Sequence, residues 1–172
     1  MIRFEPLTDR SKLSLVAQSS LHPINTSTNK LEGFFEVGVI EPRQFDLSVA
    51  ANGRLEVYAD DLKSDYSYVD RIMQTHLDTR RFPSIKAKLT NLRDKGNGRY
   101  FAVGEISFHG TTQRVENELT IAWLDDATIE IKGEADFDVR DFKVEPPTLM
   151  SISLQPVLKV KLKYVLKRVN TS

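Results

Sequence analysis

The sequence predicts an all-β fold, in which about eight to ten antiparallel strands run up and down and close into a barrel. Apolar and polar residues alternate along most of the chain, and tight-turn residues separate the alternating runs. One short segment breaks the alternation with helical spacing, and we expect it to close or flank one end of the barrel. Because the polar faces carry charges, the apolar faces point inward, which is the reverse of a membrane barrel.

Four alternating runs precede the helical segment, and each has the period of two that half-buried strands show. They cover residues 11–19, 31–39, 45–49 and 54–59. A connection rich in Asn, Ser and Thr, from Leu21 to Lys30, separates the first run from the second. Between the third and fourth runs, Asn52-Gly53 predicts a hairpin, because both residues tolerate the positive φ of a type I′ turn.

Further runs follow the helical segment, at residues 85–90, 114–123, 129–138 and 158–166. Turn residues separate the strand-like stretches at Lys95-Gly96-Asn97-Gly98, His109-Gly110 and Asp125-Asp126. A longer connection, from Arg140 to Ser153, contains Pro146-Pro147. The lysines at positions 159, 161 and 163 give the last run a solvated basic edge that discourages aggregation, with attraction to anionic lipid head groups as the alternative.

Glycine residues inside three of the predicted strands favour a barrel over a two-layered sandwich. They are Gly33, Gly104 and Gly133. Closing a sheet needs local bends, which a backbone without side chains allows. A small barrel of this kind either fills its interior with side chains or holds one small apolar ligand.

The segment from residue 66 to residue 78 fits a short helix. Its apolar positions recur at intervals of three and four, at Val69, Ile72, Met73 and either His76 or Leu77. Pro83 then forces Phe82 into an extended conformation and starts the next strand. Because a helix this short is marginal alone, we expect it to be held by whatever its apolar stripe covers.

Composition excludes several classes of function. The chain has no cysteine, so disulfides, thiol catalysis and cysteine-based zinc sites are excluded. Lys plus Arg equals Asp plus Glu at 24 each, and no basic excess marks a nucleic-acid partner. With no signal peptide and no membrane-spanning segment, we expect a cytoplasmic protein, folded as one domain over residues 1–172.

Three short motifs follow one another along the middle and late parts of the chain. The helix contains a Leu-Asp step at Leu77-Asp78 and is followed by Phe82-Pro83-Ser84-Ile85. A hairpin motif, GEISFHGTT, covers residues 104–112, and a late strand and loop run from Gly133 to Pro146-Pro147. In this order, and over about residues 12–166, these motifs resemble the YceI-like family of lipid-binding proteins.

The resemblance implies an antiparallel lipocalin-like barrel around a long apolar channel, with residues 12–166 as its core. In the best-known relatives, the channel holds an isoprenoid chain with a quinone-like or similar head group, and many relatives are periplasmic. Two positions depart from the family pattern: Ala87 stands where an aromatic residue is usual, and Lys143 where glycine is common. We expect both departures to alter the shape or polarity of the channel.

The inward faces of the strands and the helix supply the candidate ligand site. The predicted channel wall consists of Leu15, Phe35, Val57, Ile72, Met73, Leu119, Ile121, Trp123, Phe137, Leu162 and Tyr164. At the channel mouth, His76, Arg140 and Asp141 are the candidates for contact with a polar head group. The spacing of the three histidines matches no metal motif, so we predict neither a metal site nor a cofactor.

The first functional hypothesis is the binding, storage or transport of an apolar chain-like molecule inside the barrel. An isoprenoid, a quinone or a fatty-acid-like lipid would serve as the partner, and a homodimer is compatible with this reading. Two alternatives stay open: an enzyme that uses His76, Arg140 and Asp141, and a structural or interaction barrel with a filled interior. The sequence contains no nucleophile motif and no phosphate loop, so we expect no enzymatic activity and assign no catalytic residue.

Overall fold

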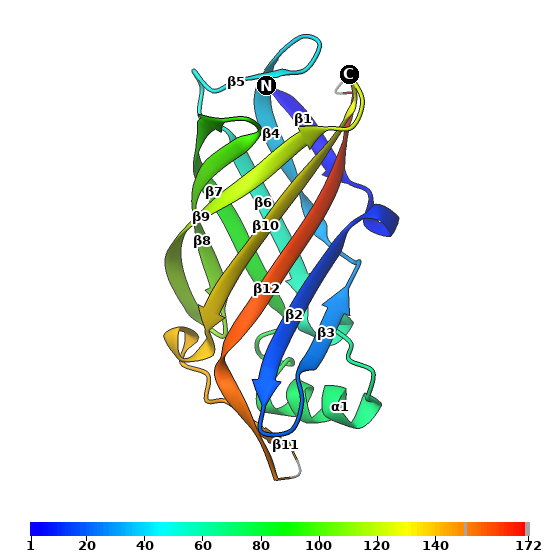
Figure 1. Ribbon diagram of the computed structural model, residues 1–172, viewed down its shortest axis with the longest axis vertical. Helices are drawn as coiled ribbons and strands as arrows, with labels where there is room; N and C mark the ends of the chain where they lie inside the picture. Colours follow the sequence, from blue (N-terminus) through cyan, green and yellow to red (C-terminus); the bar gives the residue numbers. More distant parts are fainter. Residues whose placement is uncertain (150, 171–172) are drawn as a thin grey trace.

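The computed structural model describes residues 1–149 and 151–170, and in this part of the chain twelve strands form one sheet (Figure 1). The strands are β1 (Ile2–Pro6), β2 (Lys12–Ser19), β3 (Ile24–Thr28), β4 (Glu32–Ile40), β5 (Gln44–Asp46), β6 (Asn52–Tyr58), β7 (Ser84–Gly96), β8 (Arg99–Phe108), β9 (Thr111–Trp123), β10 (Thr128–Asp138), β11 (Thr148–Leu149) and β12 (Ile152–Arg168). The helices of the described residues are the α-helix α1 (Ser67–His76) and the 3₁₀ turns η1 (Thr8–Arg10), η2 (Ala59–Asp61) and η3 (Val139–Phe142).

Eight of these strands close on themselves as a barrel. Neighbours follow the order β1-β4-β6-β7-β8-β9-β10-β12, and β12 pairs with β1 again, with every pair antiparallel. At the closing seam, Phe4 of β1 lies opposite Phe35 of β4 on one side and Arg168 of β12 on the other. β2 pairs with the rest of the long strand β12, and β3 pairs with β2. The predicted antiparallel barrel is therefore confirmed.

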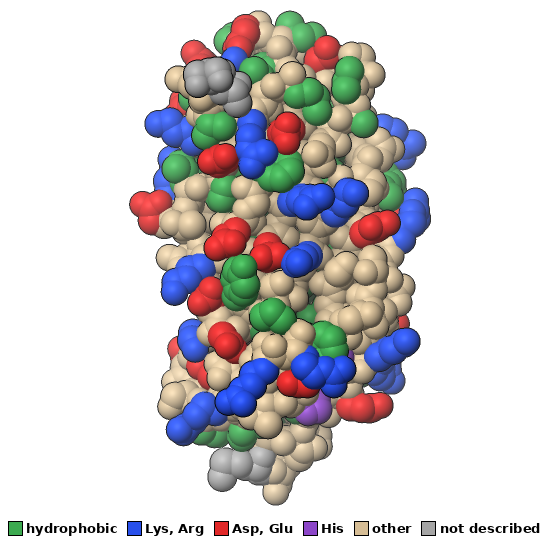
Figure 2. Space-filling view, turned by 180° about the vertical axis from the view of Figure 1, so that it is seen from behind, with side chains coloured by type: hydrophobic (Ala, Val, Ile, Leu, Met, Phe, Trp, Pro, Cys, Tyr) green, Lys and Arg blue, Asp and Glu red, His purple; other side chains and the backbone are tan. Residues whose placement is uncertain are grey.

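The outer face of the barrel is charged, and neighbouring strands carry complementary charges. Along the β10–β12 ladder, Asp136 lies opposite Lys159 and Glu134 lies opposite Lys161. The Lys161 Nζ atom is 3.6 Å from the Glu134 carboxylate. Figure 2 shows basic and acidic side chains interspersed over one face of the molecule. Because β12 has partners along both sides, its lysines lie on an inner strand and not on the predicted edge.

The hairpin predicted at Asn52-Gly53 does not form, because both residues lie inside β6. Asn52 pairs with Glu36 of β4, and Gly53 pairs with Phe35 of β4 and with Leu89 of β7. Pairing on both flanks of the strand requires an extended backbone, which overrides the local preference of this dipeptide for a turn. The chain returns to β6 through the short strand β5 and the loop that follows it.

Two further stretches differ from the prediction. The connection expected from Leu21 to Lys30 contains β3, in which Ile24 and Thr28 are buried. The strand expected at residues 45–49 continues only as far as Asp46. β1 and β3 are each five residues long, which is too short for a period of two to stand out from a loop.

The helix α1 lies across the end of the barrel that is lowest in Figure 1. It is slightly shorter than predicted and lacks a side-chain N-cap. Its Val69 is buried, and Ile72 and Met73 beside it pack in the same cluster as Ala17 of β2 and Leu149 of β11. A ten-residue helix is unstable alone, so this tertiary packing holds it in place.

The chain leaves α1 through Asp78 and not directly at a proline. Asp78 has a φ of +50°, a left-handed conformation that aspartate tolerates better than most residues. The Phe82 N–H donates to the Asp78 carbonyl at 2.9 Å, and the Ala59 N–H donates to the Pro83 carbonyl at 2.9 Å. These two bonds return the chain to the barrel wall at the start of β7.

Gly104 of β8 lies close to the backbone of β7, which gives a test of the barrel geometry. A Cβ atom at Gly104 would lie 2.4 Å from the Lys88 carbonyl oxygen, whereas a Cβ atom at Gly53 would meet no heavy atom nearer than 3.5 Å. We expect Gly104→Ala to lower the free energy of unfolding by about 1–3 kcal/mol, because backbone atoms must move apart. The matched control, Gly53→Ala, should lose much less. Urea unfolding would measure both changes, and equal losses would contradict the close approach.

Candidate functional site

A cavity of about 420 Å³ lies inside the barrel, on the side nearer to α1. Residues from ten of the twelve strands form most of its wall, and α1, η3 and the loop after η3 close one end. The wall is almost entirely apolar. Its volume falls within the range of small-molecule sites, about 300–1,000 Å³.

The exposure of inward-facing side chains changes along each strand and marks how far the cavity extends. On β12, inward residues up to Leu162 are half-buried, whereas Tyr164 and Leu166 are buried. On the neighbouring strand β10, Phe137 is half-buried and Ile129 is 0% exposed. A filled interior would bury all of these positions equally. The barrel is therefore hollow near α1 and filled toward its other end.

Five aromatic side chains fill the barrel beyond the cavity. This aromatic plug consists of Phe4, Phe35, Phe45, Tyr100 and Trp123. Phe45 stacks on Trp123, with ring centroids 5.0 Å apart, and meets Phe35 and Tyr100 in edge-on contacts at 6.0 Å each. Phe4 contacts Trp123 edge-on at 5.9 Å. Of the five, Phe35 borders the cavity and forms part of its inner end.

The outer end of the cavity is covered by segments outside the strands. Met73 of α1, Phe142 of η3 and Pro146 of the following loop all line this end. The His76 ring, through Nε2, hydrogen-bonds the carbonyl oxygen of Glu145 and so ties the helix to the loop. The cover is thus two segments, far apart in the sequence, that fasten to each other.

Tyr164 places a hydroxyl group at the inner end of the cavity. The hydroxyl donates to the Glu32 carbonyl oxygen over a long distance of 3.4 Å. Gly33 makes room for it: a Cβ atom there would lie 3.0 Å from the Tyr164 hydroxyl and 2.0 Å from the Arg54 carbonyl oxygen. Burial raises the pKa of Tyr164 above that of an exposed tyrosine, so the group stays a neutral donor.

Most of the predicted wall residues come together on the cavity. Those that line it are Leu15, Phe35, Val57, Met73, Leu119, Ile121, Phe137, Leu162 and Tyr164. Ile72 lies off the cavity, because it packs in the cluster around Val69 and Leu149. Trp123 lies off it as well, because the aromatic plug encloses its ring. Contact between the nine lining residues and a ligand stays a prediction.

His76, Arg140 and Asp141 lie at the covered end, but none of them lines the cavity. The Arg140 guanidinium pairs with the Asp138 carboxylate, with Nη2 and Oδ2 2.7 Å apart, and this hydrogen bond lowers the pKa of Asp138. The Gln113 side-chain amide donates to the Asp141 carbonyl oxygen at 2.8 Å. All three residues are exposed. The His76 contact joins α1 to the loop after η3 and the Asp141 contact joins η3 to β9, whereas the Arg140 contact is local.

Two of the groups of lining residues that sequence reasoning missed come from β8 and from the loop after η3. β8 contributes Ala102, Ile106 and Phe108, and the alternation along this stretch is a usable signal for them. The loop after η3 contributes Val144 and Pro147. A loop has no periodic pattern of apolar residues, so its position against the cavity could not be predicted from the sequence.

The histidines of the described residues do not gather with carboxylates into a metal site. The His109 ring lies against Phe82, with ring centroids 4.3 Å apart, and His22 Nδ1 lies 3.1 Å from the Pro23 carbonyl oxygen. Within residues 1–149 and 151–170, no three His, Asp or Glu side chains are grouped so that they would hold a metal ion. Over the same ranges, no helix is long and apolar enough to cross a membrane.

Comparison with known proteins identifies relatives of this barrel. The sequence profile of the family described as YceI-like domain matches residues 8–166. The crystal structure of BcnA from Burkholderia cenocepacia is 15% identical, with a TM-score of 0.78 over 93% of this chain and 98% of that chain. A polyisoprenoid binding domain from Saccharophagus degradans, implicated in plant cell wall breakdown, is 13% identical, with a TM-score of 0.77 over 97% and 98%.

A curated relative gives a shorter match. The UPF0312 protein of Shewanella denitrificans is 31% identical over 75 residues, which cover 41% of this chain. The match spans 39% of the relative's own length. The two solved structures, at their low identities, show a shared fold.

The buried Tyr164 predicts how stability responds to alkaline pH. Unfolding returns the phenol to an ordinary pKa of about 10, so above that pH the unfolded chain loses the proton first and the folded state loses stability. We expect this group to lower the free energy of unfolding by up to about 1.4 kcal/mol for each pH unit above about 10. Tyr164→Phe should flatten that dependence, whereas Tyr68→Phe, at an exposed position, should keep it. Denaturant unfolding at stepped alkaline pH measures the slopes, and parallel slopes for the wild type and Tyr164→Phe would contradict the assignment.

Proposed function

This chain belongs to the family of YceI-like domains, and on that basis we propose that it binds one apolar, chain-like molecule inside its barrel. The observation that carries the proposal is the hollow half of the barrel, where inward side chains such as Leu162 and Phe137 face the cavity and not one another. Apolar surface that faces an unfilled cavity gains little from burial, and a matching apolar ligand would supply the missing contacts.

The chemistry of the wall favours a lipid without a charged group in its buried part. Tyr164 and Asn117 bring polar side chains to the cavity wall, and the Asn117 amide already donates to the Glu134 carbonyl at 3.2 Å. An isoprenoid or a fatty-acid-like chain fits such a wall. The polyisoprenoid binding domain of Saccharophagus degradans, which shares the fold, supports the isoprenoid class.

Apolar burial supplies the affinity in this proposal. Each methylene group moved from water into the cavity contributes about 0.8 kcal/mol, so a chain binds with little polar recognition. The nine wall residues identified above would make these contacts. Storage or transport of the lipid follows from such binding, because a chain enclosed in a barrel is shielded from water.

The entrance in this proposal is the end under α1, since the aromatic plug fills the opposite end. A ligand would pass between α1 and the loop after η3, where the His76–Glu145 hydrogen bond joins the two. His76, Arg140 and Asp141 surround this end, so they are the proposed neighbours of a polar head group.

A bulky residue in the cavity should block binding without harming the barrel. Ala135 of β10 lines the cavity, and Ala122 of β9 is exposed on the outer face. We expect Ala135→Trp to weaken binding of parinaric acid at least tenfold, because the indole would occupy the space of the chain, and Ala122→Trp to bind like the wild type. Fluorescence titration of the purified proteins measures affinity, and thermal unfolding confirms that each variant is folded.

Native mass spectrometry of freshly purified protein offers an independent check of the same proposal. The wild type should carry a lipid adduct, and Ala135→Trp should not. A wild-type protein that carries no adduct and binds neither parinaric acid nor a polyisoprenoid would overturn the proposal. Equal binding by folded Ala135→Trp would show that the chain lies elsewhere.

A further inference from the structure

The cavity stops well short of the far end of the barrel. Ile121, Ile131 and Tyr164 line its inner end together with Phe35, and all four are buried. Beyond them, the strands continue, but the inward side chains pack against one another. The cavity therefore has a floor inside the barrel, and its depth is a property of the fold.

The floor is backed by a side chain that does not belong to the barrel wall. Phe45 comes from β5, which pairs with β4 and lies over the upper end of the barrel in Figure 1. Its ring meets Phe35 from behind, at 6.0 Å, and stacks on Trp123 at 5.0 Å. Phe35 thus lies between the cavity and a packed aromatic layer, so its ring cannot move out of the way of a ligand toward the far end of the barrel.

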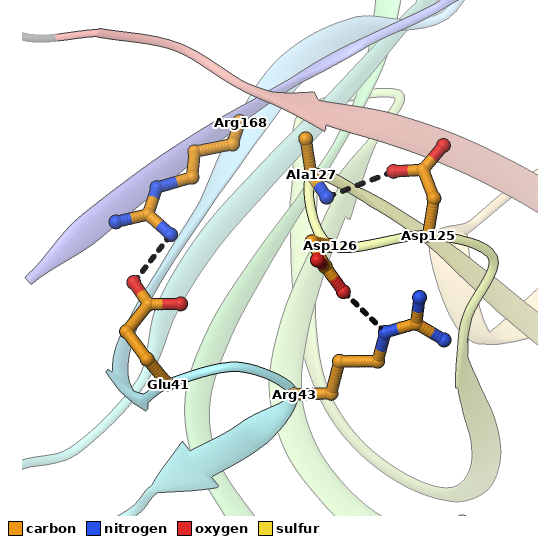
Figure 3. Close-up of polar contacts among 6 residues, drawn as sticks. All are labelled: Glu41, Arg43, Asp125, Asp126, Ala127 and Arg168. Carbon is orange, nitrogen blue, oxygen red and sulfur yellow. Dashed lines mark hydrogen bonds and ion pairs between the residues drawn. The ribbon is translucent and has the colours of Figure 1, made fainter.

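Two ion pairs fasten the segment that carries Phe45 (Figure 3). The Arg168 guanidinium lies 2.6 Å from the Glu41 carboxylate, before β5, and the Arg43 guanidinium lies 2.6 Å from the Asp126 carboxylate, in the turn between β9 and β10. Both pairs are largely exposed and contribute little each. The ion pairs help to fix the position of the β5 segment, and the aromatic contacts of Phe45 provide most of its stabilisation.

The stretch of β10 that lines the cavity gives an estimate of its depth. Ile131 at the floor and Phe137 near the mouth are six residues apart on β10, which is about 20 Å along a strand. A strand in a barrel of this size is tilted by about 40°, so the depth along the axis is about 15 Å. Half of the hydrocarbon core of a bilayer, which is the length of one membrane acyl chain, is also about 15 Å.

We propose that Phe35, backed by Phe45 and Trp123, sets the length of the chain that this barrel accepts, at about one acyl chain of a membrane leaflet. This inference rests on the proposed function and names the ligand class within it. A chain enters with its apolar end first and stops at Phe35, and its head group stays at the end under α1. An acyl chain or a short isoprenoid of similar length fits completely, and a long polyisoprenoid leaves its remaining units outside the barrel.

A length limit has a measurable signature in a series of ligands. Each methylene that enters the cavity raises the affinity about fourfold, whereas a methylene beyond the limit stays in water and adds nothing. A plot of affinity against chain length therefore rises and then levels off. The probes are saturated fatty acids from decanoate to docosanoate, measured by displacement of parinaric acid from the 172-residue protein. We expect the break between dodecanoate, for an extended chain, and hexadecanoate, for a chain bent as in a bilayer.

Two substitutions should move the break in opposite directions. Phe35→Ala opens the floor toward the aromatic layer, so the break should move to longer chains. Ala102→Leu adds a side chain to the wall at the inner end, beside the buried Leu92, so the break should move to shorter chains. Phe101→Ala is the matched control, because that ring lies on the outer face of β8 under the Arg93 guanidinium, and its break should stay in place.

The outcomes separate this inference from the proposed function. Failure of the wild type to bind any member of the series would overturn both. Affinity that rises without a break, or a break that neither variant moves, would overturn the length limit and leave lipid binding intact. If Phe35→Ala does not fold, Ala102→Leu alone decides the matter, since an unchanged break in that folded variant contradicts the proposed floor.

Discussion

Closure of the sheet through β12 is the constraint on which the rest of the structure depends. β12 pairs with β10 along one side and with β1 and β2 along the other, so the backbone groups of the wall find partners in neighbouring strands. A closed barrel of eight strands has an interior just wide enough to be filled by side chains or to hold one small ligand. At each position along the barrel axis, the size of the inward side chains then determines whether the interior is filled or open.

This barrel contains both states. Large rings, among them Phe35 and Trp123, fill the part beyond the cavity. Small residues, Gly104 on β8 with Gly133 and Ala135 on β10, face the part near α1 and leave it open. The two alternatives from the sequence, a filled barrel and a hollow one, thus each describe one part of the same interior. The boundary between the two parts lies at Phe35.

Long strands made the fold and most of the wall predictable, because the period of two along β10 and β12 is unambiguous. The end of the cavity was not predictable: Trp123 follows the same alternation as Leu119, and it is enclosed because Phe4 and Phe45 reach it from separate segments. Asn52-Gly53 shows the same limit, since pairing on both flanks of β6 overrides a strong local turn preference. Each miss depends on a contact between residues far apart in the sequence.

The filled part of the barrel supports the strands that line the hollow part. Side chains around a cavity lack packing partners on one side, which lowers the stability of any fold that contains one. Here the aromatic plug and the closed hydrogen-bonded ladder lie on the same strands that line the cavity, so β9, β10 and β12 are held in place by their far ends. Because these strands are already ordered, entry of the proposed lipid chain would cost little conformational entropy. More of the free energy of apolar burial would then contribute to binding affinity. Binding of the proposed ligand would stabilise the barrel further, by about 2.7 kcal/mol when the free ligand exceeds its Kd a hundredfold.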